Sequence, residues 1–255
     1  MYSMINDEIV IFTCVTNGFD EVRPVPKDFP FKCILFTDDI EKKVKGWDTC
    51  YISSNKISPI KSNRLIKIKL HPEILKYKNS IYIDGNVEIH IRALKLINEF
   101  LNSKFNMALN KHPRFNSVYE DLFEIFRVGI ADGNKVISVL KRCIRLGISN
   151  NDPFYECNII FRKHNVNTFN LLDDWWHYFE NGTGRDQAAF VMAAKKNKLE
   201  ILDLNLGDCR TNPGKSFSIN THNTKKNITL RLLKRLLSEL QLTRIRFFFL
   251  TRKFK

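Results

Sequence analysis

The stretch SIYIDGN at residues 80–86 places an apolar, β-type segment directly before a carboxylate, a glycine and an amide. Its first four residues are rich in β-branched and aromatic side chains, which is typical of a buried strand. Asp84 supplies the hard oxygen that a divalent cation bridging two phosphates needs, and Gly85 lets a ligand approach the backbone closely. Taken alone, Asp84, Gly85 and Asn86 fit an ordinary turn after a strand equally well.

Two strand-like segments upstream also end in polar residues. Residues 8–15 form a run rich in β-branched and aromatic side chains, and residues 32–37 form a second strand-like segment that runs into Asp38. Because ligands collect at the carboxyl ends of strands in parallel sheets, the sequence predicts a binding site at this edge. The loop after the first strand contributes Thr16, Asn17 and Gly18.

The remaining chain alternates between strand-like and helical patterns. This alternation predicts an α/β fold with a mainly parallel sheet flanked by helices. Further strands are expected at residues 48–52, 106–109 and 156–162, and a loop-rich segment at 203–227. Helices are expected at residues 62–71, 93–101, 118–127, 134–146, 168–179 and 186–195.

Two groups of basic residues are candidates for phosphate binding. Arg64 and Lys67 are three residues apart, so one helix face presents both, and such a pair suits a diphosphate. A solvated basic face is the simpler explanation of that pair taken alone. His112 follows a predicted strand inside a basic tetrapeptide, where it is either a substrate contact or a structural histidine.

Residues 175–190 contain the last candidate site. Sugars stack on aromatic rings, so Trp175 and Trp176 are candidates for an acceptor site together with Arg185, although a core position fits either tryptophan. Asp186 begins a predicted helix, where a carboxylate is stabilised in its charged form. Asp186 is therefore either an N-cap or a carboxylate that contacts a sugar hydroxyl.

Composition and charge limit the class of protein. The 255 residues carry a net charge of +14, and residues 229–255 contribute half of it through eight basic residues and one acid. Leucines at helical spacing alternate there with arginines and lysines, which predicts a basic amphipathic helix lying on an anionic membrane. A helix packed on the domain or on a partner is the alternative. We therefore divide the chain into a domain at 1–228 and a membrane-association segment at 229–255.

The cysteines and the first residues indicate the compartment. Six cysteines show neither CxxC pairing nor metal-finger spacing, which favours free thiols in a reducing compartment. The N-terminus lacks the features of a signal peptide, and no apolar stretch approaches the roughly 20 residues of a membrane span. We expect a cytoplasmic protein, peripheral on the inner face of the cell membrane.

Taken together, the segments resemble a family of glycosyltransferase-like domains found in bacterial polysaccharide loci and in plant mucilage-related proteins. The resemblance covers roughly residues 8–205 and keeps the order of the segments. Those that carry it are IVIFTCVTNGFDEV (9–22), CILFTDD (33–39), GWDTCYI (46–52), SNRLIKIKLHP (62–72), SIYIDGNVEI (80–89), MALNKHPRFNSVYED (107–121), FYECNIIFRKHN (154–165) and WWHYFENGTGRDQAAF (175–190).

That family is similar to GT-A glycosyltransferases, so the resemblance implies a nucleotide-binding α/β sheet and a nucleotide-sugar donor. Asp84 and Asn86 match the place of the metal-holding DxD motif, with His222 as a third ligand for Mn or Mg. Asn86 departs from the strict motif because an amide binds metal more weakly than a carboxylate. Residues expected to hold the donor are Thr16, Asn17, Gly18, Asp38, Arg64, Lys67, Asp84, Gly85 and Asn86.

The resemblance also implies a reaction. An acceptor hydroxyl attacks the anomeric carbon while the nucleoside diphosphate leaves, and an inverting enzyme needs a base close to that hydroxyl. Asp186 is the first candidate and Glu156 the second, with His112 near the transfer site. The acceptor is expected to be a saccharide or a lipid-linked sugar in surface polysaccharide synthesis.

Three other classes remain open at this point. A nucleotidyltransferase shares this kind of sheet, and a non-catalytic scaffold would explain Asn86. A nucleic-acid-binding protein would suit the isoelectric point of about 9.5. Against that last class, the basic excess lies in one apolar-rich segment and no binding motif is present.

Overall fold

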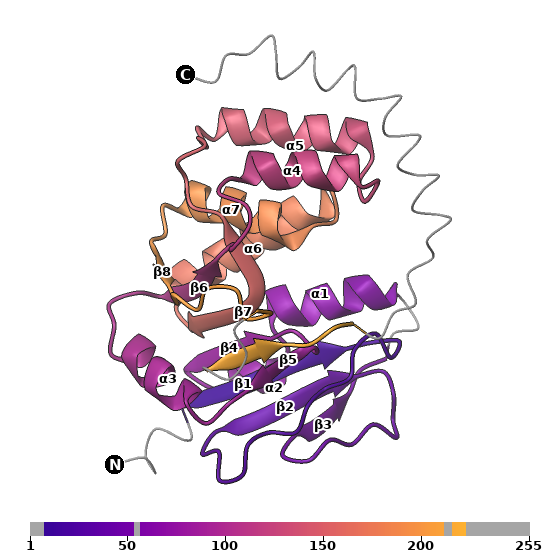
Figure 1. Cartoon of the computed structure of the whole chain (residues 1–255), viewed down its shortest axis with the longest axis vertical. Helices are drawn as coiled ribbons and strands as arrows, with labels where there is room; N and C mark the ends of the chain where they lie inside the picture. Colours follow the sequence, from indigo (N-terminus) through magenta and orange to yellow (C-terminus); the bar gives the residue numbers. More distant parts are fainter. Residues whose placement is uncertain (1–7, 54–56, 212–215, 223–255) are drawn as a thin grey trace. The chain divides into compact units, whose positions relative to one another are not determined.

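The computed structural model describes residues 8–53, 57–211 and 216–222 and divides them between two compact units (Figure 1). The first unit comprises residues up to Lys111 together with Glu156–Asp173 and Leu199–Thr224, and the second comprises His112–Tyr155 and Asp174–Lys198. The segment 229–255 lies outside the described residues, so the predicted amphipathic helix there stays a prediction.

The first unit is built on a seven-stranded sheet in the order β3-β2-β1-β4-β7-β6-β8. Strand β1 pairs in parallel with β2 and β4, β2 with β3, and β6 with β8, whereas β7 runs antiparallel to β4. The predicted mainly parallel sheet is thus confirmed. The strands are β1 (Ile9–Val15), β2 (Lys32–Thr37), β3 (Asp48–Tyr51), β4 (Asn79–Ile83), β6 (Met107–Lys111), β7 (Tyr155–Lys163) and β8 (Ile201–Asp203).

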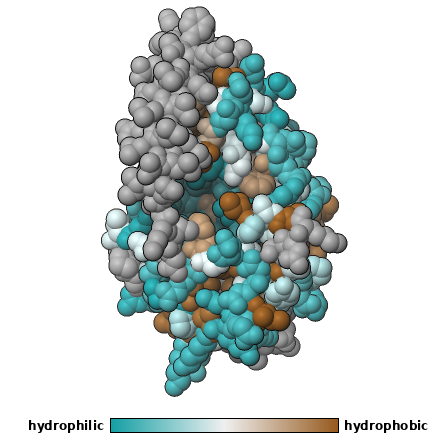
Figure 2. Space-filling model, turned by 90° about the vertical axis from the view of Figure 1, so that its right-hand side faces the viewer, coloured by the Kyte–Doolittle hydropathy of each residue, from teal (hydrophilic) through white to brown (hydrophobic). Residues whose placement is uncertain are grey.

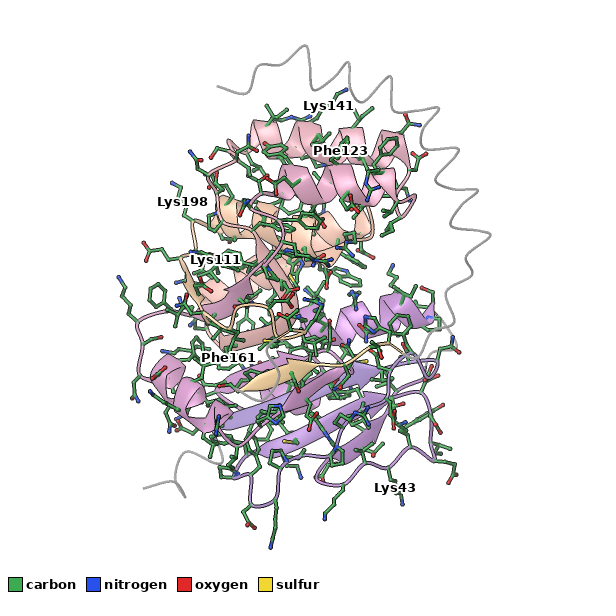
Figure 3. All side chains as sticks on the ribbon, viewed as in Figure 1. Lys43, Lys111, Phe123, Lys141, Phe161 and Lys198 are labelled. Atoms are coloured by element: carbon green, nitrogen blue, oxygen red, sulfur yellow. The ribbon has the colours of Figure 1, made fainter. Side chains whose placement is uncertain are left out.

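Both faces of the sheet are apolar, as expected for strands that are apolar along their whole length. On one face Ile11, Ile81 and Phe161 pack with Ile97 and Phe100 of α3 (Ala93–Leu101). Phe161 lies edge-to-face on both Phe100 and Phe217, and Figure 3 shows its place on the sheet. The opposite face carries Phe12, which contacts the rings of Phe36 and Tyr82.

Helix α1 (Pro59–Lys69) covers the Phe12 face and begins earlier than its apolar pattern predicts. Ser58 caps it by accepting a hydrogen bond from the Lys61 amide, and Pro59 occupies the first turn. The helix ends at Lys69 because Leu70 takes a positive φ of 61°. A separate short helix, α2 (Pro72–Leu75), then starts with His71 as its cap. The single helix predicted at 62–71 is therefore two helices.

The second unit is helical. Its core joins α4 (Val118–Arg127), α5 (Gly133–Arg145) and α7 (Asp186–Asn197) through Leu122, Phe126, Leu140 and Met192. Helix α6 (Val166–Glu180) runs from the first unit into the second. The helices predicted at these places are all present, with ends shifted by up to two residues.

The segment predicted to be a loop at 203–227 contains a strand that the sequence does not signal. Strand β9 (Phe217–Ile219) pairs antiparallel with β5 (Val87–Ile89) in a separate two-stranded sheet. Both strands are only three residues long, so their pairing depends on tertiary contacts and gives no periodicity. Among the described residues, none of the helices has the length and apolarity needed to cross a bilayer.

Figure 2 shows one face of the molecule, on which hydrophilic residues predominate and hydrophobic ones are scattered between them. Such scattering is normal for a protein surface.

Candidate functional site

Asp84 is held at the carboxyl end of β4 by two neighbours. Its Oδ1 atom accepts hydrogen bonds from the Tyr82 hydroxyl at 2.8 Å and from the Lys67 ammonium at 3.3 Å. Lys67 is almost wholly buried and its ammonium lies 4.8 Å from the centre of the Tyr82 ring, whereas Asp84 is 27% exposed. Within the described residues Oδ2 carries no hydrogen bond, so Asp84 has one fixed oxygen and one that is free to bind a ligand.

Strand β7 brings a second polar group to the same edge. Its antiparallel register with β4 sets Ile159 opposite Ile83, and the Asp84 amide continues the ladder by donating to the Asn158 carbonyl at 2.8 Å. Asn158 therefore lies directly across from Asp84 on the same face of the sheet. Two residues further, Glu156 has a side chain that is only 3% exposed.

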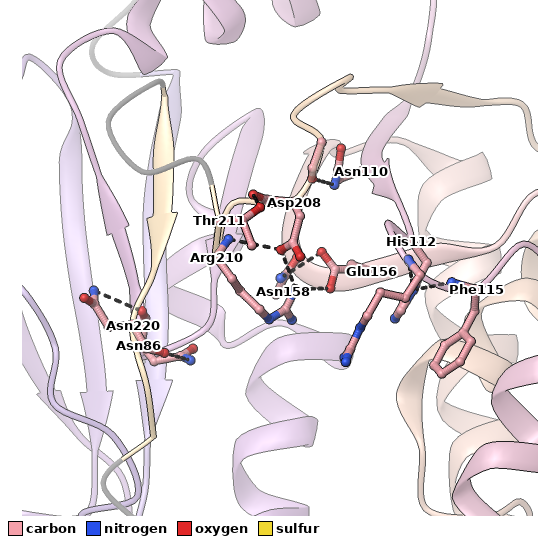
Figure 4. A network of polar contacts seen from close by, with 12 residues as sticks. Asn86, Asn110, His112, Phe115, Glu156, Asn158, Asp208, Arg210, Thr211 and Asn220 are labelled. Atoms are coloured by element: carbon pink, nitrogen blue, oxygen red, sulfur yellow. Dashed lines mark hydrogen bonds and ion pairs between the residues drawn. The ribbon is translucent and has the colours of Figure 1, made fainter.

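Arg210 compensates the charge of Glu156. Its Nη1 lies 2.8 Å from Glu156 Oε1 and 3.2 Å from Asp208 Oδ1, and the Asn158 amide donates to Glu156 Oε2 at 3.4 Å (Figure 4). Burial lowers the pKa of Arg210, but the charges of Glu156 and Asp208 outweigh it and raise that pKa. Both oxygens of Glu156 are thus occupied, which makes it a group that positions Asn158 and Arg210.

Asp20, in the loop after β1, lies against Gly85. A Cβ on Gly85 would come within 2.3 Å of Val15 and 3.0 Å of Asp20 Cβ, so only glycine fits at this contact. Burial raises the pKa of Asp20 and the charge of Asp84 raises it further, whereas the hydrogen bond from His222 lowers it. His222 Nδ1 lies 2.6 Å from Asp20 Oδ1 and, facing a carboxylate, carries the proton there.

Asn86 connects the turn to the last described segment. Its side-chain amide donates to the Asn220 carbonyl at 2.7 Å, and the Asn220 amide donates to the Asn86 carbonyl at 2.8 Å. These bonds extend the β5–β9 pairing and draw His222 toward Asp20. Asn86 therefore has a structural role in this turn, and its role in metal binding stays a prediction.

The other predicted donor residues also gather at the carboxyl ends of β1 and β2. The Asn17 amide donates to both oxygens of Asp38, at 2.9 and 3.1 Å, and the Thr16 hydroxyl donates to the Pro59 carbonyl at 2.8 Å. Gly18 has a positive φ of 59°, which suits glycine. These contacts fix the loop, so its exposed backbone is available to a ligand.

The two basic residues of α1 differ in their surroundings. Arg64 bonds to the neighbouring Asn63 side chain. Burial raises the pKa values of Asp20 and Tyr82, and the charge of Arg64 opposes this rise, which places Arg64 near this edge. Lys67 is buried, and its ammonium donates a hydrogen bond to Asp84. Behind them lies a second buried cation, Arg162, which donates to the Lys67 carbonyl at 2.8 Å and has a pKa lowered by burial to about 9.

The predicted acceptor residues belong to the second unit. Trp175 is completely buried against Phe190 and donates its indole N–H to the Asp186 carbonyl at 2.8 Å, so in this structure it is a core residue that no sugar reaches. Trp176 is partly exposed and its role stays a prediction. Arg185 forms an ion pair at 3.1 Å with Asp121, whose pKa is raised by complete burial.

Asp186 and His112 also belong to the second unit. Arg185 occupies the N-cap position of α7 and no side chain caps the helix, so Asp186 is the first helical residue rather than the cap. His112 Nδ1 accepts the amides of Arg114 and Phe115 at 3.2 and 3.0 Å. The neutral ring therefore keeps its proton on Nε2, which suits hydrogen-bond donation rather than general-base catalysis.

The divalent cation expected from the sequence has Asp84, Asn86 and His222 as its candidate ligands. Among the described residues, no three His, Cys, Asp or Glu side chains are grouped to hold a metal. Asn86 bonds to Asn220 through its amide nitrogen and His222 to Asp20 through Nδ1, so Asn86 Oδ1 and His222 Nε2 are the atoms that would bind a cation with Asp84. The three-ligand site stays a prediction, and no step below depends on a metal.

Two residues of the site, Asn158 and Arg210, are not indicated by the sequence. Asp20 ends the polar loop at 16–20 that follows the first strand, as Asp38 and Asp84 follow theirs. Asn158 is hidden inside an apolar strand, and Arg210 lies in an irregular segment. Asn158 reaches the site through the antiparallel register of β7, and Arg210 reaches it through the loop before β9.

Comparison with known proteins gives a family match and similar solved structures. A family model described as "TOD1/MUCI70, glycosyltransferase-like domain" matches residues 35–212. Among solved structures, the apo crystal structure of mouse xyloside xylosyltransferase 1 is similar, with a TM-score of 0.49, 10% sequence identity, and coverage of 84% of this chain and 98% of that one. The comparison with curated proteins gives no match.

Proposed function

Because the chain belongs to the family of TOD1/MUCI70 glycosyltransferase-like domains, we propose that it transfers a sugar from a nucleotide-diphosphate donor to a saccharide or lipid-linked acceptor. The observation that carries this proposal is the gathering of Asp84, Asp38 and the Thr16–Gly18 loop at the carboxyl ends of three neighbouring parallel strands. In parallel sheets this edge is where nucleotides and other ligands bind.

The charges at this edge suit a donor with a leaving diphosphate. Arg64 supplies a guanidinium that can bind phosphate oxygens in a bidentate manner, and Lys67 keeps Asp84 in place. As the bond to the anomeric carbon breaks, negative charge grows on the leaving phosphate and a fixed cation nearby stabilises it. A divalent cation would also stabilise the negative charge on the leaving phosphate, and the nucleotide-binding prediction below includes Mn²⁺ and Mg²⁺ for this reason.

The acceptor hydroxyl loses a proton in the reaction. Both oxygens of Glu156 are already engaged, one by Arg210 and the other by Asn158, so this carboxylate is less accessible to the acceptor hydroxyl. Asp186 therefore stays the first candidate for the base, with Arg185 beside it in the sequence.

Nucleotide binding is the first prediction. UDP or GDP is expected to raise the melting temperature because binding to the folded state alone stabilises it, by about 2.7 kcal/mol at 100 times the dissociation constant. The measurement is thermal unfolding with a panel of nucleotides, alone and with Mn²⁺ or Mg²⁺. A larger shift with the ion supports a metal at the diphosphate, and no shift with any nucleotide at millimolar concentration contradicts the assignment.

We also propose that the enzyme works at the inner face of the cell membrane, in surface polysaccharide synthesis, with residues 229–255 as its attachment. The proposal rests on the eight basic residues and the leucine spacing of that segment. Each basic residue near an anionic surface contributes about 1 kcal/mol of binding.

The second prediction follows from this attachment. Replacing Arg244, Arg246, Arg252 and Lys253 with glutamine in the full chain is expected to release it from anionic vesicles, as measured by co-sedimentation. The matched control replaces four exposed lysines of the described residues, Lys43, Lys45, Lys95 and Lys141, and is expected to stay bound. Equal binding by both variants would show that the segment is not the anchor.

A further inference from the structure

One buried amide oxygen lies beside Asp84 without a hydrogen-bond donor. Asn158 is 9% exposed, and its Oδ1 atom is buried and receives no hydrogen bond from the described residues. Leaving a buried acceptor unsatisfied is costly, so native proteins do so mainly where a ligand or an ordered water completes the bond.

The orientation of this amide is fixed. Asn158 Nδ2 donates to Glu156 Oε2 at 3.4 Å, and the other oxygen of that carboxylate lies 2.8 Å from Arg210 Nη1. Because the amide nitrogen is on the Glu156 side, Oδ1 faces away from that carboxylate. Arg210 is in turn held by Asp208, in a segment that Asn110 anchors through Leu206 and Gly207.

Two acceptor oxygens thus lie on adjacent strands. Asn158 and Asp84 are cross-strand neighbours, whose Cβ atoms lie about 5 Å apart in such pairs. Asn158 Oδ1 is a buried acceptor without a donor, and Asp84 Oδ2 is a partly exposed acceptor beside it. A phosphate offers only acceptors and would be repelled, whereas a sugar ring carries neighbouring hydroxyl groups that donate. We propose that Asn158, together with Asp84, binds the hydroxyl groups of the donor's sugar and so contributes to the choice of that sugar.

This inference rests on the proposed function and is tested by comparing ligands with and without the sugar. Calorimetric affinities are measured for UDP against UDP-glucose and for GDP against GDP-mannose, with the wild-type chain and with Asn158→Ala. Loss of one hydrogen bond is expected to weaken binding of the sugar nucleotide about 3- to 10-fold and to leave binding of the bare nucleotide unchanged. The melting temperature of the unliganded variant is expected to change little, because the unsatisfied Oδ1 is removed while Glu156 Oε2 loses its donor at 3.4 Å.

Asn165→Ala is the matched control. Asn165 lies beyond the other end of β7, and its amide is also bonded at both ends, at 2.9 and 3.1 Å, so its loss is expected to lower stability without a selective effect on sugar nucleotides. Asn158→Ser, too short to reach the same hydroxyl, is a second variant with the same expected result as Asn158→Ala.

Three outcomes overturn the inference. Equal affinities of variant and wild type for the sugar nucleotides would show that a buried water satisfies Oδ1. Equal weakening of sugar nucleotide and bare nucleotide would show a general structural role. If the wild-type chain binds neither ligand of either pair, the proposed function fails together with the inference.

Discussion

Replacing Asp84 with asparagine is expected to lower turnover about 100- to 1,000-fold, the usual effect of removing one charged contact at a reacting group. Asparagine keeps an oxygen that accepts from Tyr82 and Lys67, so the local hydrogen bonds persist. The carboxylate charge and the second equivalent oxygen are lost. The measurement is release of nucleoside diphosphate from the best donor, with folding checked by circular dichroism.

A matched control is available on the same sheet. Asp48 also pairs with a lysine, Lys32, but both are exposed and Asp48 begins its strand rather than following one. Asp48→Asn is expected to leave turnover unchanged within about two-fold, since exposed pairs contribute about 0–1 kcal/mol. Full activity of Asp84→Asn would remove Asp84 from the site and leave its pairing with Lys67 as a purely structural feature.

The second large effect concerns stability. Arg210→Gln leaves the Glu156 carboxylate buried without its cation, and breaking a buried pair costs about 3–5 kcal/mol. Because Arg210 is 40% exposed, water partly replaces it, and we expect a loss of about 1–3 kcal/mol in the free energy of unfolding. Urea denaturation at neutral pH measures this loss.

The double variant Glu156→Gln/Arg210→Gln separates charge from packing. It buries no carboxylate and is expected to recover most of the stability that Arg210→Gln loses. Asp208→Asn removes the more exposed partner of the same guanidinium and is expected to cost less than about 1 kcal/mol. If the double variant is as unstable as the single one, Arg210 stabilises the fold through packing and not through Glu156.

Much of the fold could be predicted from the sequence because its strands are apolar throughout and its helices have regular spacing. Residues 93–101 and 118–127 are helical as predicted, and strands β1, β2 and β4 begin and end within about one residue of their patterns. The antiparallel direction of β7 and the β5–β9 pairing could not be predicted. The direction of a strand leaves no periodic signal in its sequence, and β5 and β9 are too short to show a strand pattern.

The candidate site also contains residues that the sequence predicts and residues that it does not. Asp38 and Asp84 were found because each directly follows an apolar strand, and the structure places both at one edge of the sheet. Asn158 lies within an apolar run whose pattern signals only burial. The sequence pattern fits Lys67 as one of two exposed basic residues on a helix, but its side chain is buried beside Tyr82. The pattern does not show this, because the packing of α1 on the sheet decides which side of the helix faces inward.

Hydrogen exchange measured by mass spectrometry tests the central claim most directly, namely that a nucleotide diphosphate binds where Asp84 and the loop after β1 meet. With saturating UDP or GDP, exchange is expected to slow in peptides covering residues 16–20 and 84–90, and to stay unchanged in peptides of α5 in the second unit. Binding that slows exchange elsewhere, with these two segments unaffected, would contradict the assigned site.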